Sequence, residues 1–246
     1  MTPKKTSLKL FTSLHANLFT PIGAVGKANV QKTVFFVTAL FAATLLAFSA
    51  QAKIITDVDG NKIDIPDRVE RVADLWHANN QIVLLLGGAN KLVATTTTIA
   101  ANPWYAEVYP NIKNVPVLTN GETIQVEELL SQKPEAVLLS KKSMLTEVNQ
   151  AGLKGVRVSF QDFDGLKKTV RITAEVLGDK APAVAESYIK ELEDNIQFVE
   201  SRIKDVKEAQ RPTVLHITKG TDLLMIDGGK SMIGEWIKMA GGKNVL

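Results

Sequence analysis

Aromatic, imidazole and amide side chains follow an apolar strand that the sequence predicts over Val69–Leu75. Trp76 and His77 come directly after this strand, and Asn79 follows two residues later. An aromatic face beside an imidazole suits a flat or metal-bearing ligand, and histidine is the commonest metal ligand in proteins. His77 is therefore the candidate metal ligand. The competing structural interpretation is that His77 caps the first turn of a helix and Trp76 packs in the core.

Further candidate ligand contacts follow the other predicted strands. In a parallel sheet the ligand crevice lies beyond the carboxyl ends of the strands, and this rule selects residues directly from the sequence. It selects Thr97, Trp104, Tyr105, Ser140, Lys141 and, near the end of the chain, His216, Lys219 and Asp227. Alternatives remain open: the threonine run at 95–98 also fits a β-branched strand end, and the adjacent lysines 141 and 142 fit a solvated surface.

Signatures of catalysis are missing from the sequence. It has no cysteine, no G-x-S-x-G and no H-E-x-x-H, and the run Gly228-Gly229-Lys230-Ser231 lacks the earlier glycine of a phosphate loop because position 223 is Leu. We expect no enzyme and no intrinsic cofactor. A hydrolase is a weaker alternative, with only His77 and His216 as bases.

The periodicity of the chain predicts an α/β fold. Short apolar strands alternate with helices from Val69 to Ser159, and a hairpin around Asp59-Gly60 precedes them. A helix over Leu166–Leu177 is followed by a long amphipathic helix over Ala183–Ala209, roughly 40 Å in length. After Arg211-Pro212 the α/β pattern restarts. We therefore predict two parallel-sheet lobes joined by a rigid helix.

The first 52 residues predict a cleavable export signal. They hold five lysines and no acidic residue, an apolar run covers Val34–Phe48, and Ser49-Ala50-Gln51-Ala52 offers a cleavage site before Lys53. The apolar run is shorter than the ~20 residues of a membrane-spanning helix, which is the alternative. Because there is no cysteine to carry a lipid, we expect a periplasmic protein.

The charge of the chain depends strongly on this leader. The whole sequence has a net charge of +3, but residues 53–246 hold 24 basic and all 26 acidic residues, a net charge of −2. The basic isoelectric point is therefore no indication of nucleic-acid binding.

The domain prediction is a signal over 1–52, an N-terminal α/β lobe over 53–165, connecting helices over 166–210, and the start of a truncated C-terminal lobe over 211–246.

Several segments, taken in order, resemble the periplasmic binding proteins of iron-siderophore, haem and vitamin B12 importers. They are ITDVDGNKIDIPDRVERVADL, LLLGGANKLVATT, VEELLSQKPEAVLLS, AEVLGDKAPA and GEWIKMAGGKNV, and the resemblance covers residues 53–246. Members of this family run on past the equivalent of Leu246, which is why we expect an incomplete second lobe.

The resemblance implies a solute-binding component of an ABC importer. Its ligand would be a ferric siderophore, haem or a related metal chelate, and its partners a membrane permease and an ATPase. The family implies a permease-docking role for Glu127, which could equally be an ordinary exposed carboxylate. Molybdate, tungstate or another metal ion is an alternative ligand, and a remnant without transport activity is the alternative from another class. We expect a monomer.

Overall fold

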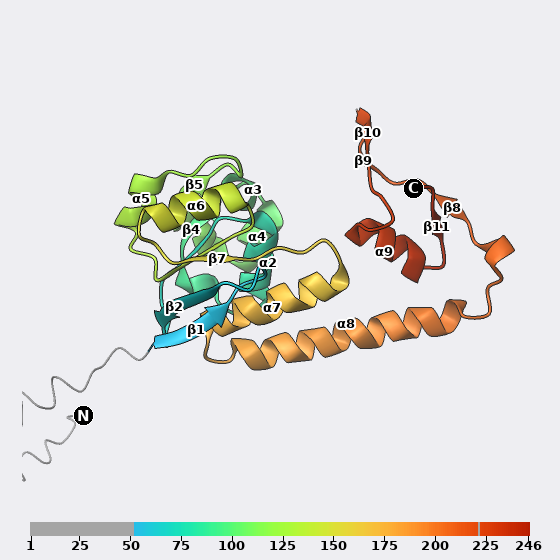
Figure 1. Cartoon of the computed structure of the whole chain (residues 1–246), viewed down its shortest axis with the longest axis horizontal. Coiled ribbons are helices and arrows are strands. Elements are labelled where there is room, and N and C mark those ends of the chain that lie inside the picture. The colour runs from blue at the N-terminus through green and yellow to red at the C-terminus, as the bar shows by residue number, and fades with distance from the viewer. Residues whose placement is uncertain (1–51, 221) are drawn as a thin grey trace, which may run out of the picture. The chain divides into compact units, whose positions relative to one another are not determined.

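The computed structural model describes residues 52–220 and 222–246, whose elements are labelled in Figure 1. The predicted export signal therefore lies outside the described residues, apart from Ala52, where the first strand begins. Within these two ranges, no helix is both long enough and apolar enough to cross a membrane.

A five-stranded parallel sheet is the main structural unit. Its strands lie in the order β5-β4-β3-β6-β7, and every neighbouring pair is parallel. They span β3 Val72–Asp74, β4 Leu92–Thr96, β5 Val117–Thr119, β6 Ala136–Leu139 and β7 Gly155–Arg157. Strand β3, the first of these five along the chain, therefore lies in the middle of the sheet. This is the strand order of doubly wound nucleotide-binding folds. The predicted α/β fold is confirmed.

Helices cover both faces of this sheet. Neighbouring strand residues belong to different buried clusters: Val72 packs with Ile82 and Val170, whereas Ala73 packs with Leu129 and Met144. This alternation is expected where side chains of a strand point to opposite faces and both faces are covered. The connecting elements are α2 His77–Leu85, a 3-10 turn Ala89–Lys91, α3 Thr97–Ala100, α4 Pro103–Val108, a 3-10 turn Pro110–Asn114, α5 Val126–Ser131, α6 Lys142–Gln150 and α7 Phe163–Leu177.

The predicted hairpin is present as β1 Ala52–Thr56 paired with β2 Lys62–Pro66. One carboxylate oxygen of Asp57 accepts hydrogen bonds from the backbone N–H groups of Asp59 and Asn61, each at 2.9 Å. Gly60 supplies the left-handed backbone (φ +89°) that the turn needs. Arg157 Nη1 lies 2.7 Å from Asp59 Oδ1, so an ion pair ties the turn to β7.

Helices α7 and α8 meet at a capped junction. The side chain of Asp162 accepts a hydrogen bond from Gly165 N at 2.7 Å and begins α7, which ends at Gly178 in a left-handed conformation. The buried Lys91 donates to the Leu177 carbonyl at 2.9 Å and pairs with Asp179 at 2.7 Å. This contact satisfies a carbonyl that the end of a helix would otherwise leave unpaired.

The long helix differs from its prediction at both ends. Helix α8 spans Ala181–Ile203, so it includes Pro182 and stops six residues before the predicted Ala209. Proline is tolerated in a first helical turn because its missing N–H would be unpaired there anyway. The early end fits the burial, since Ile203 is half-buried whereas residues 204–210 are all exposed, and helices gain most stability from packing. A short 3-10 turn, Glu208–Gln210, follows.

The α/β pattern restarts after Pro212, as predicted, in a C-terminal segment over residues 211–246. Strand β8 Thr213–Val214 pairs in parallel with β11 Lys243–Asn244, and β9 Ile217–Lys219 pairs antiparallel with β10 Asp222–Ile226. Strands β8 and β9 are separated by only two residues of the chain, yet they belong to different sheets. Helix α9 Met232–Met239 begins at Ser231, whose hydroxyl accepts from Gly234 N at 3.0 Å.

Candidate ligand-binding crevice

The strand order reverses between β3 and β6, which defines one edge of the sheet as the candidate crevice. Ligands of open α/β sheets bind at this switch point, beyond the carboxyl ends of the strands. The connection after β3 begins with Leu75, whose N–H donates to the Leu138 carbonyl of β6 at 2.8 Å. Trp76 and Ser140, which follow these two strands, are thereby brought to the same edge.

Trp76 and His77 lie at the start of α2. Trp76 is half-buried and packs against Phe160, with ring centroids 5.0 Å apart, while the His77 ring stands edge-on to Trp76 at 6.5 Å. His77 is exposed, and no side-chain hydrogen bond caps the helix. The capping role considered for His77 is therefore absent, and its imidazole is open to a ligand.

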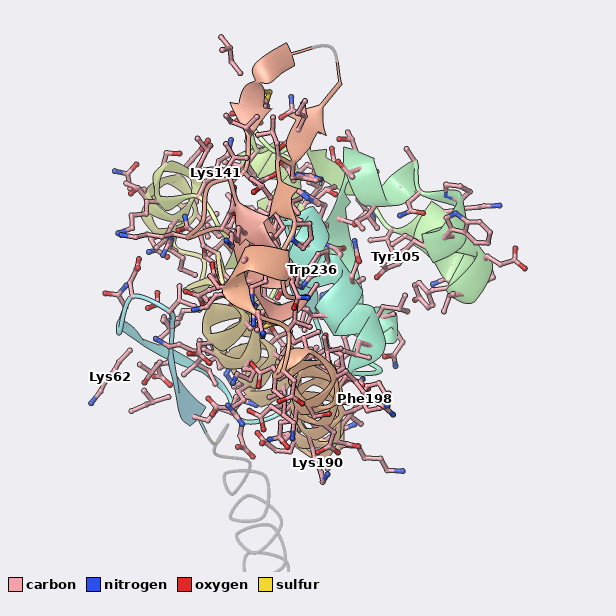
Figure 2. All side chains as sticks on the ribbon, turned by 90° about the vertical axis from the view of Figure 1, so that its right-hand side faces the viewer. Lys62, Tyr105, Lys141, Lys190, Phe198 and Trp236 are labelled. Atoms are coloured by element: carbon pink, nitrogen blue, oxygen red, sulfur yellow. The ribbon has the colours of Figure 1, made fainter. Side chains whose placement is uncertain are left out.

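Two helix N-termini face this edge, because α2 follows β3 and α6 follows β6. Neither helix has a side-chain cap or an acidic residue in its first turn. The unpaired N–H groups of such turns carry partial positive charge. Lys141, which is labelled in Figure 2, precedes α6 and forms an ion pair with Glu122 at 2.6 Å. The positive character of this edge thus comes from the two helix N-termini, because the charge of Lys141 is paired with Glu122.

A buried polar network lies beneath this edge; the sequence indicates several of its members as ligand contacts, but not Asp74 or Thr173. Asp74 is fully buried; one carboxylate oxygen accepts from Trp76 N at 3.1 Å and the other from Asn79 Nδ2 at 2.9 Å. Asn79 Oδ1 in turn accepts from the Thr173 hydroxyl of α7 at 2.9 Å. Burial raises the pKa of Asp74 to about 8, although the Trp76 and Asn79 hydrogen bonds act in the opposite direction.

Asn80 extends this network toward β4 and α4. Its amide donates to the carbonyls of Asp74 and Trp76, and its Oδ1 accepts from Thr95 at 2.8 Å. The Asn80 carbonyl accepts from the Tyr105 hydroxyl at 3.0 Å, and burial raises the pKa of Tyr105. The signal in the sequence was the adjacent pair of asparagines behind a strand that ends in aspartate.

The network separates the predicted contacts into two groups. Asn79 and Tyr105 are buried and hydrogen-bonded inside the protein, so they can support the crevice but do not line its open edge. Trp104 is 79% exposed, on a helix capped by Asn102, and Thr97 is exposed at the start of α3. These two residues stay candidates for direct contact.

The remaining predicted residues lie elsewhere. Glu127 is exposed in the first turn of α5, with Glu128 beside it. The backbone of Lys219 lies in β9. An open cavity of about 610 Å³ adjoins α8 and α9, and its lining includes Lys204, Arg211 and Lys230. None of its lining residues is among the candidate contacts that the sequence indicates.

Comparison with known proteins assigns the chain to a family. A family model described as "Periplasmic binding protein" matches residues 72–246. The chain belongs to this periplasmic binding protein family, which confirms the resemblance that its sequence segments indicated.

Curated relatives include the high-affinity haem uptake system protein IsdE of Staphylococcus aureus, strain bovine RF122 / ET3-1. The two sequences are 30% identical over 154 residues, which cover 60% of this chain and 51% of IsdE. The same protein from strain Newman is 29% identical over an equal length. The chain thus spans about half the length of the curated relatives it matches.

Solved structures share the fold at lower sequence identity. MolA of Haemophilus influenzae, bound to molybdate, has a TM-score of 0.68 and 21% identity, with 78% of this chain and 65% of MolA covered. The vitamin B12 binding protein BtuF of Vibrio cholerae has a TM-score of 0.57 and 17% identity, with 73% of this chain and 67% of BtuF covered. At these identities the likeness concerns the fold.

Proposed function

We propose that the chain is the periplasmic solute-binding component of an ABC importer for an iron complex. The ligand would be a ferric siderophore, haem or a related metal chelate, passed to an inner-membrane permease with its ATPase. Membership of the binding-protein family supports the class of function, and the haem uptake protein IsdE supports the class of ligand.

The observation that carries this proposal is the composition of the switch-point edge. It combines the half-buried ring of Trp76 with the exposed imidazole of His77. An aromatic surface can stack on a flat chelate while a neutral imidazole nitrogen binds its metal. The exposed Trp104 would extend the aromatic surface, and the buried network would hold the edge in position.

A metal oxyanion such as molybdate is the second candidate ligand. It is favoured by Lys141, by the two uncapped helix N-termini and by the fold likeness to the molybdate-binding MolA. An oxyanion would use these donors and would need neither Trp76 nor His77. The two candidates therefore differ in the residues on which binding depends.

Export and docking complete the proposal. The basic, apolar and small-residue segments of 1–52 would direct the chain to the periplasm, with cleavage between Ala52 and Lys53. Glu127, exposed on α5, would contact the permease as a charged docking residue.

Native mass spectrometry with metal analysis of the exported chain, purified from periplasm, tests the proposal. We expect a bound metal chelate, or its uptake after titration with haemin or with a ferric hydroxamate. Uptake of molybdate alone would favour the second candidate. If the chain takes up none of these ligands, the binding function is wrong for this chain and a remnant without transport activity is the better interpretation.

A substitution at this edge of the sheet distinguishes between the two candidate ligands. His77→Ala should weaken binding of the chelate by about 10-fold or more, because a coordinate bond to the metal is lost, and should leave molybdate binding unchanged. Lys62→Ala is the matched control, since Lys62 is exposed on β2 (Figure 2) and no proposed contact involves it. Equal loss in both variants would contradict the role of His77.

A further inference from the structure

A second imidazole, His216, is held by a carboxylate in the C-terminal segment. His216 lies between β8 and β9, and its Nδ1 is 2.6 Å from Asp227 Oδ2. The Thr218 hydroxyl donates to the same carboxylate oxygen at 2.8 Å. In the part of the chain that the structure describes, this is the one contact within 4 Å between a histidine ring nitrogen and a carboxylate.

The backbone around Asp227 is fixed as well. Asp227 N donates to the His216 carbonyl at 3.3 Å, and the Asn244 side-chain amide donates to the Asp227 carbonyl at 2.9 Å. Asn244 belongs to β11, whose partner strand β8 ends two residues before His216. The pair is therefore held by contacts from two strands, through Thr218 of β9 and Asn244 of β11, and by the backbone bond between Asp227 and His216. Its geometry does not depend on one flexible side chain.

This geometry decides which ring nitrogen is available. An ionised carboxylate at Nδ1 requires the proton there, so a neutral His216 ring carries its lone pair on Nε2. Among the described residues Nε2 has no hydrogen-bond partner, and the side chain of His216 is 44% exposed.

A carboxylate behind an imidazole is a recurring feature of protein metal sites. The carboxylate fixes the tautomer and orientation of the ring and makes the free nitrogen a better ligand. A histidine that only stabilised the β9–β10 hairpin would not need an exposed Nε2 without a hydrogen-bond partner. The antiparallel pairing of β9 with β10 already joins these two strands. The pair is therefore better explained by binding than by stability.

We propose that His216 coordinates a metal through Nε2, with Asp227 and Thr218 as positioning residues. The metal would be a transition-metal ion such as iron, held in a chelate that leaves one coordination position free for the protein. In this step Nε2 donates its lone pair to the metal and displaces a water molecule or a weak ligand, with no change of oxidation state. The inference rests on the proposed function, since it assigns a second contact to the same class of ligand.

Titration of the purified chain with haemin tests the inference. Optical absorption and electron paramagnetic resonance report whether imidazole nitrogen is bound to the iron. For wild type we expect an imidazole-ligated spectrum. His216→Ala should lose the His216 signal, and added free imidazole should restore it, because the small molecule can occupy the position that the side chain left.

Asp227→Asn separates positioning from structure. It keeps the size of the side chain but cannot hold the proton on Nδ1 in the same way, so we expect haemin affinity to fall by about 10- to 100-fold. Thr218→Val should have a smaller effect in the same direction. Circular dichroism verifies that each variant is folded, and if His216→Ala does not fold, Asp227→Asn and Thr218→Val still decide the question.

The outcomes distinguish the two proposals. If wild type binds haemin and His216→Ala binds it with the same spectrum and affinity, the inference is wrong while the proposed function stands. If wild type binds neither haemin nor a ferric hydroxamate, both proposals are wrong. Loss of the signal in His216→Ala with rescue by imidazole supports both.

Discussion

Asp74 shows at the scale of one residue how burial and hydrogen bonding compete. Its carboxyl accepts two hydrogen bonds that suit the ionised form, yet complete burial raises its pKa to about 8. In the unfolded chain an aspartate has a pKa near 3.9. Between about pH 4 and 8 the folded state therefore keeps a proton that the unfolded state releases, and the contribution of this group to stability falls as the pH rises.

The variant Asp74→Asn should remove this dependence. For wild type we expect Asp74 to contribute a decrease in the free energy of unfolding of up to about 1.4 kcal/mol per pH unit between pH 5 and 7. Asn carries no titrating proton, so the slope of the variant should be smaller. Urea unfolding at several pH values measures it, with Asp64→Asn on exposed β2 as the control. Equal slopes for Asp74→Asn and wild type would show that the group does not titrate in this range.

The α7–α8 junction shows how one side chain positions a whole element. Lys91 lies in the turn before β4. Its side chain donates a hydrogen bond to the carbonyl of Leu177, the last residue of α7, and pairs with Asp179, two residues before α8. Because Lys91 is buried, its loss leaves the Leu177 carbonyl without this donor. The direction in which α8 leaves the sheet therefore depends on a contact between segments 86 residues apart in the chain.

The variant Lys91→Met should destabilise the protein by about 1 to 3 kcal/mol, the usual cost of an unsatisfied buried polar group. Asp179→Asn is the matched control. It removes the exposed half of the ion pair, and Asn tolerates the left-handed backbone at this position, so its cost should be below about 1 kcal/mol. Chemical denaturation measures both, and similar losses would mean that the ion pair, not the carbonyl contact, stabilises the junction.

Binding and docking are assigned to different places on the molecule as a whole. The candidate ligand edge lies at the carboxyl ends of β3 and β6, whereas Glu127 lies on α5, the connection between β5 and β6. A change at the docking position should therefore leave ligand affinity unaltered. A charge at the rim of an interface acts mainly on the rate of association.

The variant Glu127→Ala should slow uptake of the ligand by cells several-fold, up to about 10-fold, while the dissociation constant of the purified chain stays unchanged. Glu191→Ala, on the exposed surface of α8, is the control for loss of one negative charge. Unchanged uptake in the Glu127 variant would exclude this docking role, and reduced ligand affinity would place Glu127 in the binding site instead.

Local patterns in the sequence determined most of the elements. The Asp59-Gly60 turn and the end of the helix at Leu177 both follow from interactions within a few residues, and the structure has them where the sequence predicts. The end of α8 was predicted less well, because an apolar stripe continues past Ile203 while burial does not. Helix length depends on tertiary packing, which periodicity does not report.

For the candidate site, too, the sequence determined some features and the tertiary structure decided others. The sequence by itself determined the family and the residues that follow each strand, because the carboxyl ends of parallel strands share one edge. Only the tertiary structure decided that Asn79 and Tyr105 are buried supports while His77 and Trp104 are exposed. It also decided that His216 meets Asp227. Such contacts join segments far apart in the chain, and their geometry depends on how the elements pack, which no local pattern of residues encodes.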